Sequence, residues 1–151
     1  MLVPPPLWFV GAFLLAWLVL DRRVRALPLV PARLERAADI AAMALIAAGA
    51  LLFLSCFALF VQRRTTIMPP GHPSSLVVRG PYTFTRNPMY VAMTLLYLGA
   101  TLAIGTAWAL VLLPLPLLIL NAVVIPFEER RLSQTFGDDY RRYTERVRRW
   151  I

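Results

Sequence analysis

From Ile40 to Val61 the chain runs without a single charged residue. A helix rises about 1.5 Å per residue, so about 20 apolar residues cross the roughly 30 Å hydrocarbon core of a bilayer. The segment from Ala37 to Val61 is therefore predicted to be a membrane-spanning helix that is long enough to tilt. The composition agrees, since the chain is 59% hydrophobic and 16% charged, whereas soluble domains carry about 25% charged residues.

Three further apolar segments qualify as spans or nearly do. Leu7–Leu20 is short and can be extended into the prolines at positions 4 to 6, and Met89–Gly105 is followed after a very short turn by Ala107–Ile125. The last two must form an antiparallel helical hairpin. We therefore expect an all-α integral membrane protein with about four transmembrane helices, a C-terminal helical hairpin and a cytoplasmic tail.

Prolines and a glycine divide the C-terminal part. Pro114 and Pro116 lie inside the last span, where each removes a backbone donor, so a kink is predicted there. Pro126 suits the first turn of a short helix over residues 126–136, and Gly137 is a plausible terminator for it.

The last residues are amphipathic. Asp138 or Asp139 can cap a further helix. Its apolar face would carry Tyr140, Tyr143, Val147, Trp150 and Ile151, and its basic face Arg141, Arg142, Arg148 and Arg149. We predict that this tail helix lies in the membrane interface.

All sixteen basic residues are arginine, and the net charge is +8. The arginines flank the apolar runs, which favours contact with anionic lipid headgroups over a soluble nucleic-acid surface, so no nucleic-acid partner is expected. With four spans, both termini share one side with the loop 62–87 and eleven arginines, against five in the loop 21–36. The positive-inside rule then places the termini in the cytoplasm. The absence of lysine hints at a GC-rich bacterial genome, hence a bacterial inner membrane.

Several classes of site are disfavoured. The single Cys56 provides neither a disulfide framework nor a thiol-based metal site, and His72 is a lone histidine in a proline-rich loop, so no metal is expected. The seven glycines form no G-x-G-x-x-G motif, which excludes a Rossmann-type nucleotide fold. The N-terminal apolar segment lacks a preceding basic region and is expected to be retained rather than cleaved.

Polar residues concentrate at two places that the hairpin brings to the same side of the membrane. At the first, Asn87 is a good N-cap, Pro88 a good first helical residue, and Tyr90 lies in the first turn of the third span. Arg86 is unfavourable at the positive end of that helix dipole unless an anion or water compensates it.

The second place is the pair Glu128 and Glu129, directly after the fourth span. Adjacent carboxylates near the headgroup boundary repel each other and lose hydration unless cations accompany them. Pairing with Arg130, Arg131 or the basic tail is the simpler interpretation on physical grounds. A site for a cationic ligand group is the alternative.

The two blocks together resemble a known superfamily. The sequence RGPYTFTRNPMY, a helical hairpin and EERRLSQTFGDDYRRYTERVRRW resemble the isoprenylcysteine carboxyl methyltransferase and phospholipid methyltransferase superfamily. The resemblance covers residues 62–151, which would form the methyltransferase core. Residues 1–61 would supply two N-terminal transmembrane helices of the same single membrane domain, 1–151.

The resemblance implies a membrane-embedded methyltransferase that uses S-adenosylmethionine, held by the cytoplasmic helix ends and the tail. The residues that match the motifs are Arg86, Pro88 and Tyr90 in the first block, Glu128 and Glu129 in the second, and Arg146 and Val147 near the end. With Asn87, the first five would bind the cofactor. Arg146 is the candidate catalytic residue, since it could hold a carboxylate or phosphate acceptor and borders the apolar face next to Trp150 on the projected tail helix.

Two positions depart from the family pattern. Asn87 stands where the family often has histidine, and because an amide does not titrate, a general-base role there is ruled out while cofactor binding survives. Ala92 stands where the family often has glycine, and its methyl group limits how closely another group can approach the helix backbone. Both changes bear on substrate choice.

The chemistry of these residues suggests which of them would bind each group of the cofactor. Glu128 and Glu129 would face its ammonium or ribose hydroxyls, and Arg86 with Asn87 its carboxylate. The acceptor would be hydrophobic or lipid-modified and would enter from the bilayer, as a carboxylate, an amine or a small thiol or acid. The alternative is a non-catalytic membrane subunit that docks anionic lipid or a partner through its arginine-rich tail.

Overall fold

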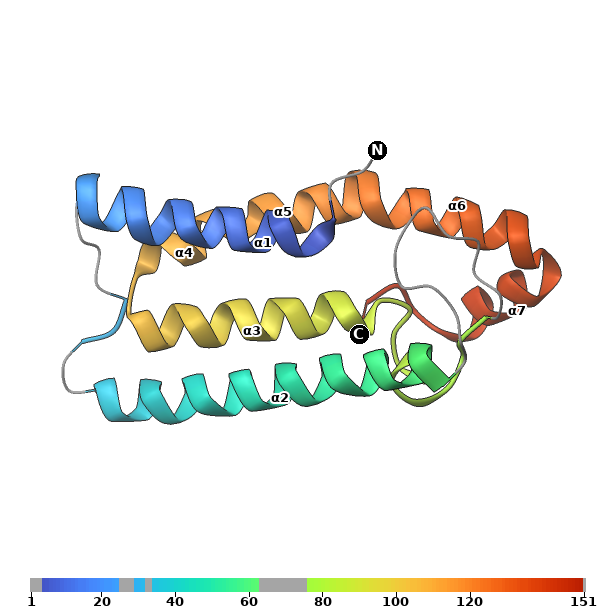
Figure 1. The fold of residues 1–151 in the computed structure, drawn as a ribbon, viewed down its shortest axis with the longest axis horizontal. Coiled ribbons are helices and arrows are strands. Elements are labelled where there is room, and N and C mark those ends of the chain that lie inside the picture. Colours follow the sequence, from blue (N-terminus) through green and yellow to red (C-terminus); the bar gives the residue numbers. More distant parts are fainter. Residues whose placement is uncertain (1–3, 25–28, 32–33, 63–75, 151) are drawn as a thin grey trace.

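The computed structural model describes residues 4–24, 29–31, 34–62 and 76–150 (Figure 1). Every regular element in those ranges is a helix, as predicted. The first rod joins α1 (Pro5–Leu14) to a π-helical segment, η1 (Leu15–Val24), and the second is α2 (Glu35–Gln62). A short 3-10 turn, η3 (Gly80–Thr83), precedes the third rod, α3 (Pro88–Ile104).

The fourth rod is a run of four segments. It comprises α4 (Ala107–Leu112), α5 (Pro114–Ile119), the π-helical η4 (Leu120–Val124) and α6 (Ile125–Phe136). The break at Leu113 falls where Pro114 and Pro116 were predicted to kink the span. The helix predicted over residues 126–136 is present as α6, with Pro126 in its first turn and Gly137 after its end, and it continues directly from η4. The tail helix α7 (Asp138–Arg146) follows Gly137, whose φ of 49° favours glycine.

Among the residues that the structure describes, length and hydropathy identify three helices able to cross a membrane: Pro5–Arg22, Glu35–Gln62 and the stretch that begins at Ala107. That last stretch has 40 residues up to Arg146, which at 1.5 Å each would be about twice a bilayer's thickness. Its crossing part is therefore the uncharged portion that ends before Glu128. The apolar helix Pro88–Ile104 is shorter, about 25 Å, so the count of four spans stays a prediction.

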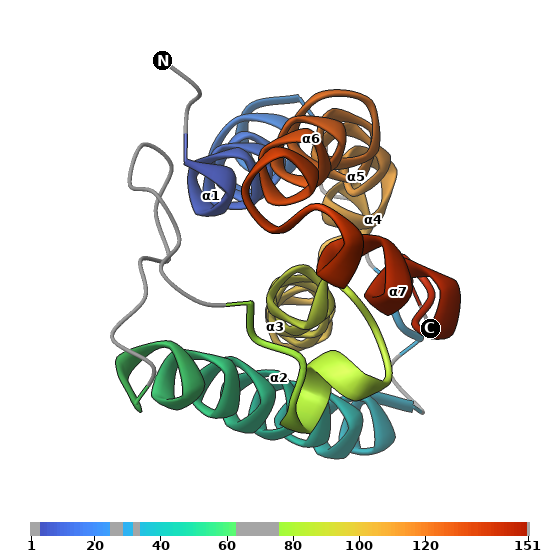
Figure 2. The same ribbon diagram turned by 90° about the vertical axis from the view of Figure 1, so that its right-hand side faces the viewer.

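The rods run up and down in an antiparallel bundle (Figure 1). Seen from the end, α3 lies in the middle, with α2 on one side and the first and fourth rods on the other (Figure 2). Residues 29–31, between the first two rods, and the α3–α4 turn share one end of the bundle, where the Leu29 amide donates to the Gly105 carbonyl at 2.8 Å. The start of α3, the end of α6 and the tail gather at the other end.

Two glycines let α2 and α3 approach to backbone contact. A Cβ on Gly49 would meet the Ala92 carbonyl oxygen at 3.0 Å, and one on Gly99 would meet the Ala42 carbonyl oxygen at 3.0 Å. Small residues of this kind drive helix association in lipid, where there is no hydrophobic force between helices. Ala92 is fully buried, and the missing Cβ of Gly49 on the opposite helix leaves room for the Ala92 backbone.

On the other side of α3, aromatic packing joins it to the first and fourth rods. The rings of Phe13 and Tyr97 meet edge to face with centroids 5.3 Å apart, and the Tyr97 hydroxyl donates to the Ala109 carbonyl at 2.8 Å. The outward surface is apolar as well. Leu51 on α2 is 68% exposed and Leu118 on the fourth rod 64% exposed, which suits a helix surrounded by lipid tails rather than water.

Candidate active site

The candidate site begins at the first turn of α3. Pro88 is the first residue of the helix, and the Asn87 carbonyl accepts hydrogen bonds from the amides of Tyr90 and Val91 at 3.0 and 3.1 Å. Asn87 occupies the N-cap position of α3, as predicted, but its side chain makes no capping hydrogen bond. Its Nδ2 donates instead to the carbonyl of Arg149 at 2.8 Å, so Asn87 fastens the C-terminal tail to the start of α3.

The tail leaves the helical path after α7. Val147 is extended, with φ −121° and ψ 128°, so the predicted continuation of the amphipathic helix is wrong. No side-chain cap from Asp138 or Asp139 begins α7 either, since both lie in its first turn. The extended segment returns to the α3 side, where the Arg86 amide donates to the Arg148 carbonyl at 2.9 Å. Backbone carbonyls outside regular structure need donors from elsewhere, and the first polar block supplies donors for those of Arg148 and Arg149.

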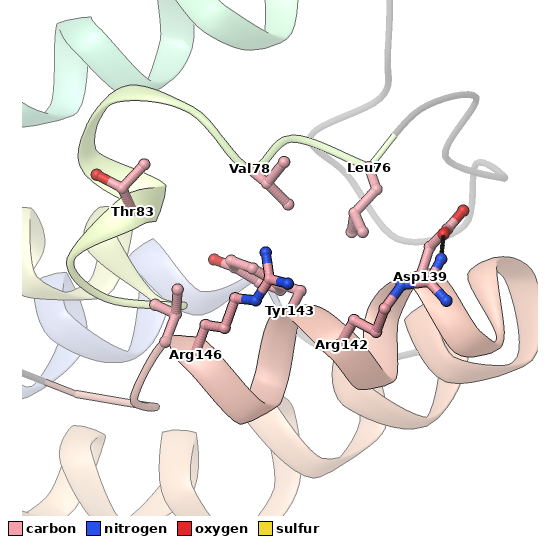
Figure 3. Close-up of a pocket in the computed structure, with 8 residues that line it drawn as sticks. Leu76, Val78, Thr83, Asp139, Arg142, Tyr143 and Arg146 are labelled. Carbon is pink, nitrogen blue, oxygen red and sulfur yellow. Dashed lines mark hydrogen bonds and ion pairs between the residues drawn. The ribbon is translucent and has the colours of Figure 1, made fainter.

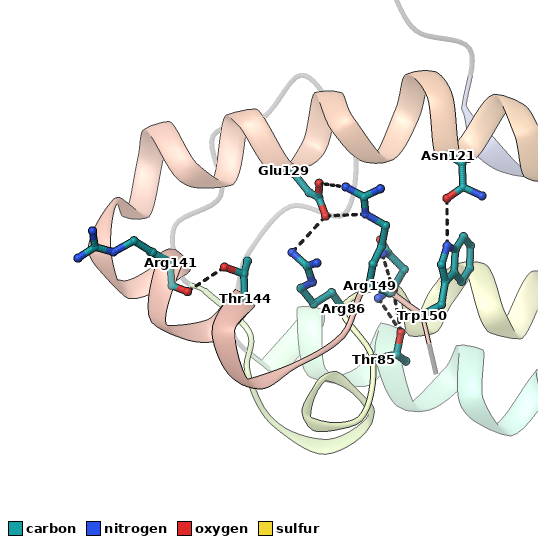
Figure 4. A network of polar contacts seen from close by, with 9 residues as sticks. Thr85, Arg86, Asn121, Glu129, Arg141, Thr144, Arg149 and Trp150 are labelled. Atoms are coloured by element: carbon teal, nitrogen blue, oxygen red, sulfur yellow. Dashed lines mark hydrogen bonds and ion pairs between the residues drawn. The ribbon is translucent and has the colours of Figure 1, made fainter.

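Glu129 is paired with two arginines from different parts of the chain (Figure 4). The Arg149 guanidinium donates through Nε at 3.1 Å to one oxygen and through Nη2 at 2.6 Å to the other. Arg86 Nη1 lies 3.2 Å from the first oxygen. The expected pairing of an acid with the basic tail is therefore present, together with an ion pair to the Arg-Asn-Pro block.

Glu128 faces α3. The Tyr90 hydroxyl donates to Glu128 Oε1 at 2.6 Å, across 38 residues of sequence. Glu128 lies just beyond the apolar stretch, and burial raises the pKa of its carboxyl. The hydrogen bond from Tyr90 and the guanidinium of Arg131 lower this pKa and so offset part of the rise. The hairpin thus brings the two predicted blocks together.

Two tyrosines of the tail helix α7 lie beside these paired acids and arginines. The Tyr143 hydroxyl donates to the Tyr82 carbonyl at 2.8 Å, which ties α7 to the η3 turn. Burial, with the neighbouring Tyr140 adding to it, raises the pKa of Tyr143 to about 12. Tyr140 is itself buried beside Arg86. Both phenols therefore stay protonated at neutral pH.

Arg146 lies in a separate open groove (Figure 3). The groove has a volume of about 600 Å³ and lies between the segment that leads into and through η3 and the helix α7 with the residue after it. Its lining residues are Leu76, Val78, Thr83, Asp139, Arg142, Tyr143, Arg146 and Val147. Because the helix ends at Arg146, the projection that put it beside Trp150 does not apply. Trp150 instead donates from Nε1 to Asn121 Oδ1 on the fourth rod at 3.0 Å.

The remaining candidates add no reactive centre. Cys56 is buried in α2 and packs with Val77 and Tyr82. His72 lies outside the described residues. Within the described ranges, His, Cys, Asp and Glu side chains form no group of three or more that could hold a metal ion.

Most of the chain matches a known protein family. Residues 37–139 match the family model for phospholipid methyltransferases, more than half of the chain. The chain belongs to this family. The resemblance found in the sequence is thereby confirmed, and membership assigns the chain to the membrane methyltransferases. The matched region runs from α2 to the first residues of α7, so it contains Tyr90 and the Glu128–Glu129 pair but not the docked tail.

A shorter relative is also similar. An uncharacterized protein of Haemophilus influenzae is 40% identical over 63 residues, which are 42% of this chain and 100% of that protein. No solved structure matches the chain.

Sequence reasoning missed the residues that dock the tail. Arg149 was assigned to the outward basic face of a continued helix, and neither Thr85 nor Asn121 was singled out. The Thr85 hydroxyl donates to the Arg149 carbonyl at 3.1 Å. No proline or glycine follows Arg146, so the sequence carries no helix-ending signal that could have revealed the extended segment.

Proposed function

We propose that the chain is an S-adenosylmethionine-dependent methyltransferase whose cofactor lies between the start of α3, α6 and the docked tail. The observation that carries the proposal is the pair of cross-links at this place, Tyr90 to Glu128 at 2.6 Å and Arg86 to Glu129 at 3.2 Å. They join the two motif blocks of the family into one cluster at a helix end.

The cluster has the chemistry that such a ligand needs. S-adenosylmethionine carries a sulfonium and an ammonium, which acids complement, and a carboxylate, which guanidinium groups complement. Arg86 Nε is buried and has no hydrogen-bond partner in the described structure. A buried donor without an acceptor costs about 1–3 kcal/mol, so an anionic ligand oxygen at this place would relieve a cost already present.

The protein's own residues then have separable tasks. Glu128 supplies negative charge toward the ammonium, and Glu129 orients the guanidinium groups that face the carboxylate. The bound cofactor supplies an activated methyl group on sulfur. The catalytic task left to the protein is to hold the accepting atom in line at about 3 Å. Asn87 fastens the tail and cannot act as a base, because its amide does not titrate.

The acceptor we propose is lipid-like or lipid-modified, methylated on a carboxylate oxygen or an amine nitrogen. The apolar outer surface of the rods supports entry from the bilayer. If the acceptor is anionic, Arg146 in its groove with Arg142 is the candidate to hold it. We also propose that the protein lies in a bacterial inner membrane with its termini and this site on the cytoplasmic side, as the arginine distribution favours.

The test is transfer of a labelled methyl group from S-adenosylmethionine to a bacterial lipid extract by the purified protein. Wild type should label lipid-soluble material, and Glu128→Gln should lower the rate at least about 10-fold, the cost of losing one charge-assisted contact. Glu145→Gln is the matched control, since Glu145 is exposed on α7. Equal rates for wild type and Glu128→Gln would contradict the proposed site. Absence of transfer together with tail-dependent binding to anionic vesicles would favour the non-catalytic subunit.

A further inference from the structure

Arg149 holds a place in the cluster that its sequence position does not explain. Its guanidinium makes the two-pronged pair with Glu129, at 3.1 and 2.6 Å, and shares that carboxylate with Arg86. The side chains of Arg86 and Glu129 are 17% and 20% exposed, and that of Arg149 is 40% exposed. The three groups therefore form a half-buried cluster with an open side at Arg149.

The charges of this cluster do not balance. Two guanidinium groups face one carboxylate, so the trio carries one surplus positive charge. Glu128 next to it is already opposed by Arg131 and does not remove the surplus. Like charges held together away from water are unfavourable unless an anion joins them.

Hydrogen-bond donors are also in excess. A guanidinium has five N–H donors, and the pair with Glu129 uses two of those on Arg149. Arg86 keeps a buried Nε without a partner in the part of the chain that the structure describes. A planar two-oxygen anion is the ligand that such a pair of forks recognises best.

Arg149 is held in position by its backbone rather than by its charge alone. Its carbonyl accepts from the Thr85 hydroxyl at 3.1 Å and from Asn87 Nδ2 at 2.8 Å, and the preceding carbonyl accepts from the Arg86 amide at 2.9 Å. The next residue, Trp150, is anchored by its hydrogen bond to Asn121. These bonds fix the guanidinium next to Arg86 before any ligand arrives.

From these observations we infer that Arg149 is a cofactor-binding residue, which forms with Arg86 a two-guanidinium cradle for a carboxylate. The inference rests on the proposed function, in which that carboxylate belongs to the methionine part of S-adenosylmethionine. Glu129 is then the positioning residue that holds both forks. The docked tail completes the site, although it lies outside the region matched by the family.

The experiment compares calorimetric binding of S-adenosylmethionine and of its decarboxylated analogue, which lacks only the carboxylate. Wild type should bind the complete cofactor at least about 10-fold more tightly than the analogue, the discrimination expected of one charge-assisted contact. Arg149→Gln should lose about 10-fold or more for the complete cofactor and change little for the analogue. Arg141→Gln is the control, because Arg141 is 70% exposed and pairs only locally with Asp138 in the described structure.

Arg149→Lys guards against a folding defect, since it keeps the charge and loses the fork, and should retain part of the preference. Equal losses for both ligands would show a merely structural role and overturn the inference. Tighter binding by Arg149→Gln would overturn it too, because Arg149 would then compete with the ligand for Glu129. If wild type binds neither compound, the proposed function fails and the inference falls with it.

Discussion

The Tyr90 hydroxyl is the atom that links the first motif block to the second. Tyr90→Phe removes the 2.6 Å bond to Glu128 and leaves a buried carboxylate without its donor. We predict a loss of about 10-fold or more in affinity for S-adenosylmethionine, since a hydrogen bond to a charged group contributes about 1.5–3 kcal/mol. Tyr97→Phe on the same helix removes a bond to the Ala109 carbonyl and should lower thermal stability without changing the affinity. Equal affinities for Tyr90→Phe and wild type, by calorimetry, would contradict the role of Tyr90.

Glu128 should make cofactor binding depend on pH. Burial raises the pKa of its carboxyl above the ordinary value of 4.5, and only the ionised form attracts a cation. Affinity for S-adenosylmethionine should therefore be full at pH values above the raised pKa and fall as pH is lowered through it, before ordinary carboxylates titrate. The measurement is binding over a pH series. Glu128→Gln should show weaker affinity without this fall, and a fall that persists in the variant would assign it to another group.

For single residues, the sequence predicted which ones lie close together but not which hydrogen bonds they form. The short turn after α3 forced the block at Arg86 and Tyr90 toward Glu128 and Glu129, and the structure brings them together. The partners were less predictable. Asn87 is a residue type typical of N-caps, but its side chain bonds the tail instead of capping the helix. The donor and acceptor atoms of an amide suit either use.

Among the elements, α2 and α3 depend on the glycines between them. Gly99→Ala would place a Cβ 2.6 Å from Ile46 Cγ1 and 3.0 Å from the Ala42 carbonyl oxygen, so the helices must separate. We predict a destabilisation of about 1–3 kcal/mol, as for overpacked cores, seen as a lower melting temperature in detergent. Gly11→Ala on α1 is the matched control, because its Cβ would meet nothing within 4 Å. An unchanged melting temperature for Gly99→Ala would contradict the close approach.

Element limits followed from the sequence wherever a local signal exists. The span predicted over Ala37–Val61 is Glu35–Gln62, and the hairpin helix predicted from Met89 begins at Pro88. Uncharged length, prolines and Gly137 carry that information. The extended tail after Arg146 could not be predicted, because its hydrogen bonds run to a distant segment rather than to neighbours in sequence. The π-helical segments η1 and η4 have no signal in the sequence that distinguishes them from α-helix.

For the whole molecule, the up-and-down bundle (Figure 1) predicts that the tail and the start of α2 lie on opposite sides of the membrane. In a Cys56→Ala background, a cysteine at exposed Arg141 (Arg141→Cys) should react with a membrane-impermeant maleimide in inverted vesicles only. One at exposed Glu35 (Glu35→Cys) should react in right-side-out cells only. Labelling of both positions from the same side would contradict the bundle's orientation in the bilayer.

The spatial order of the rods was not evident from the sequence. Nearly uniform apolar segments show no polar face that would distinguish the outside of the bundle from its inside. Nothing in the sequence therefore placed α3 in the centre or showed that α2 packs mainly against α3. Gly49 and Gly99 were the usable signal, since small residues mark close helix contacts in lipid. In contrast, the expected up-and-down order of four apolar segments predicted that the tail lies at the same end of the bundle as the start of α3 (Figure 1).

The most direct test of the central claim is equilibrium binding of S-adenosylmethionine to the detergent-purified protein, with Glu129→Ala compared with wild type. Wild type should bind, and the variant should lose affinity at least about 10-fold, because Arg86 and Arg149 lose the carboxylate that orients them. Glu145→Ala, on the exposed side of α7, should bind as wild type does. Failure of wild type to bind would contradict the account, and so would equal binding by Glu129→Ala.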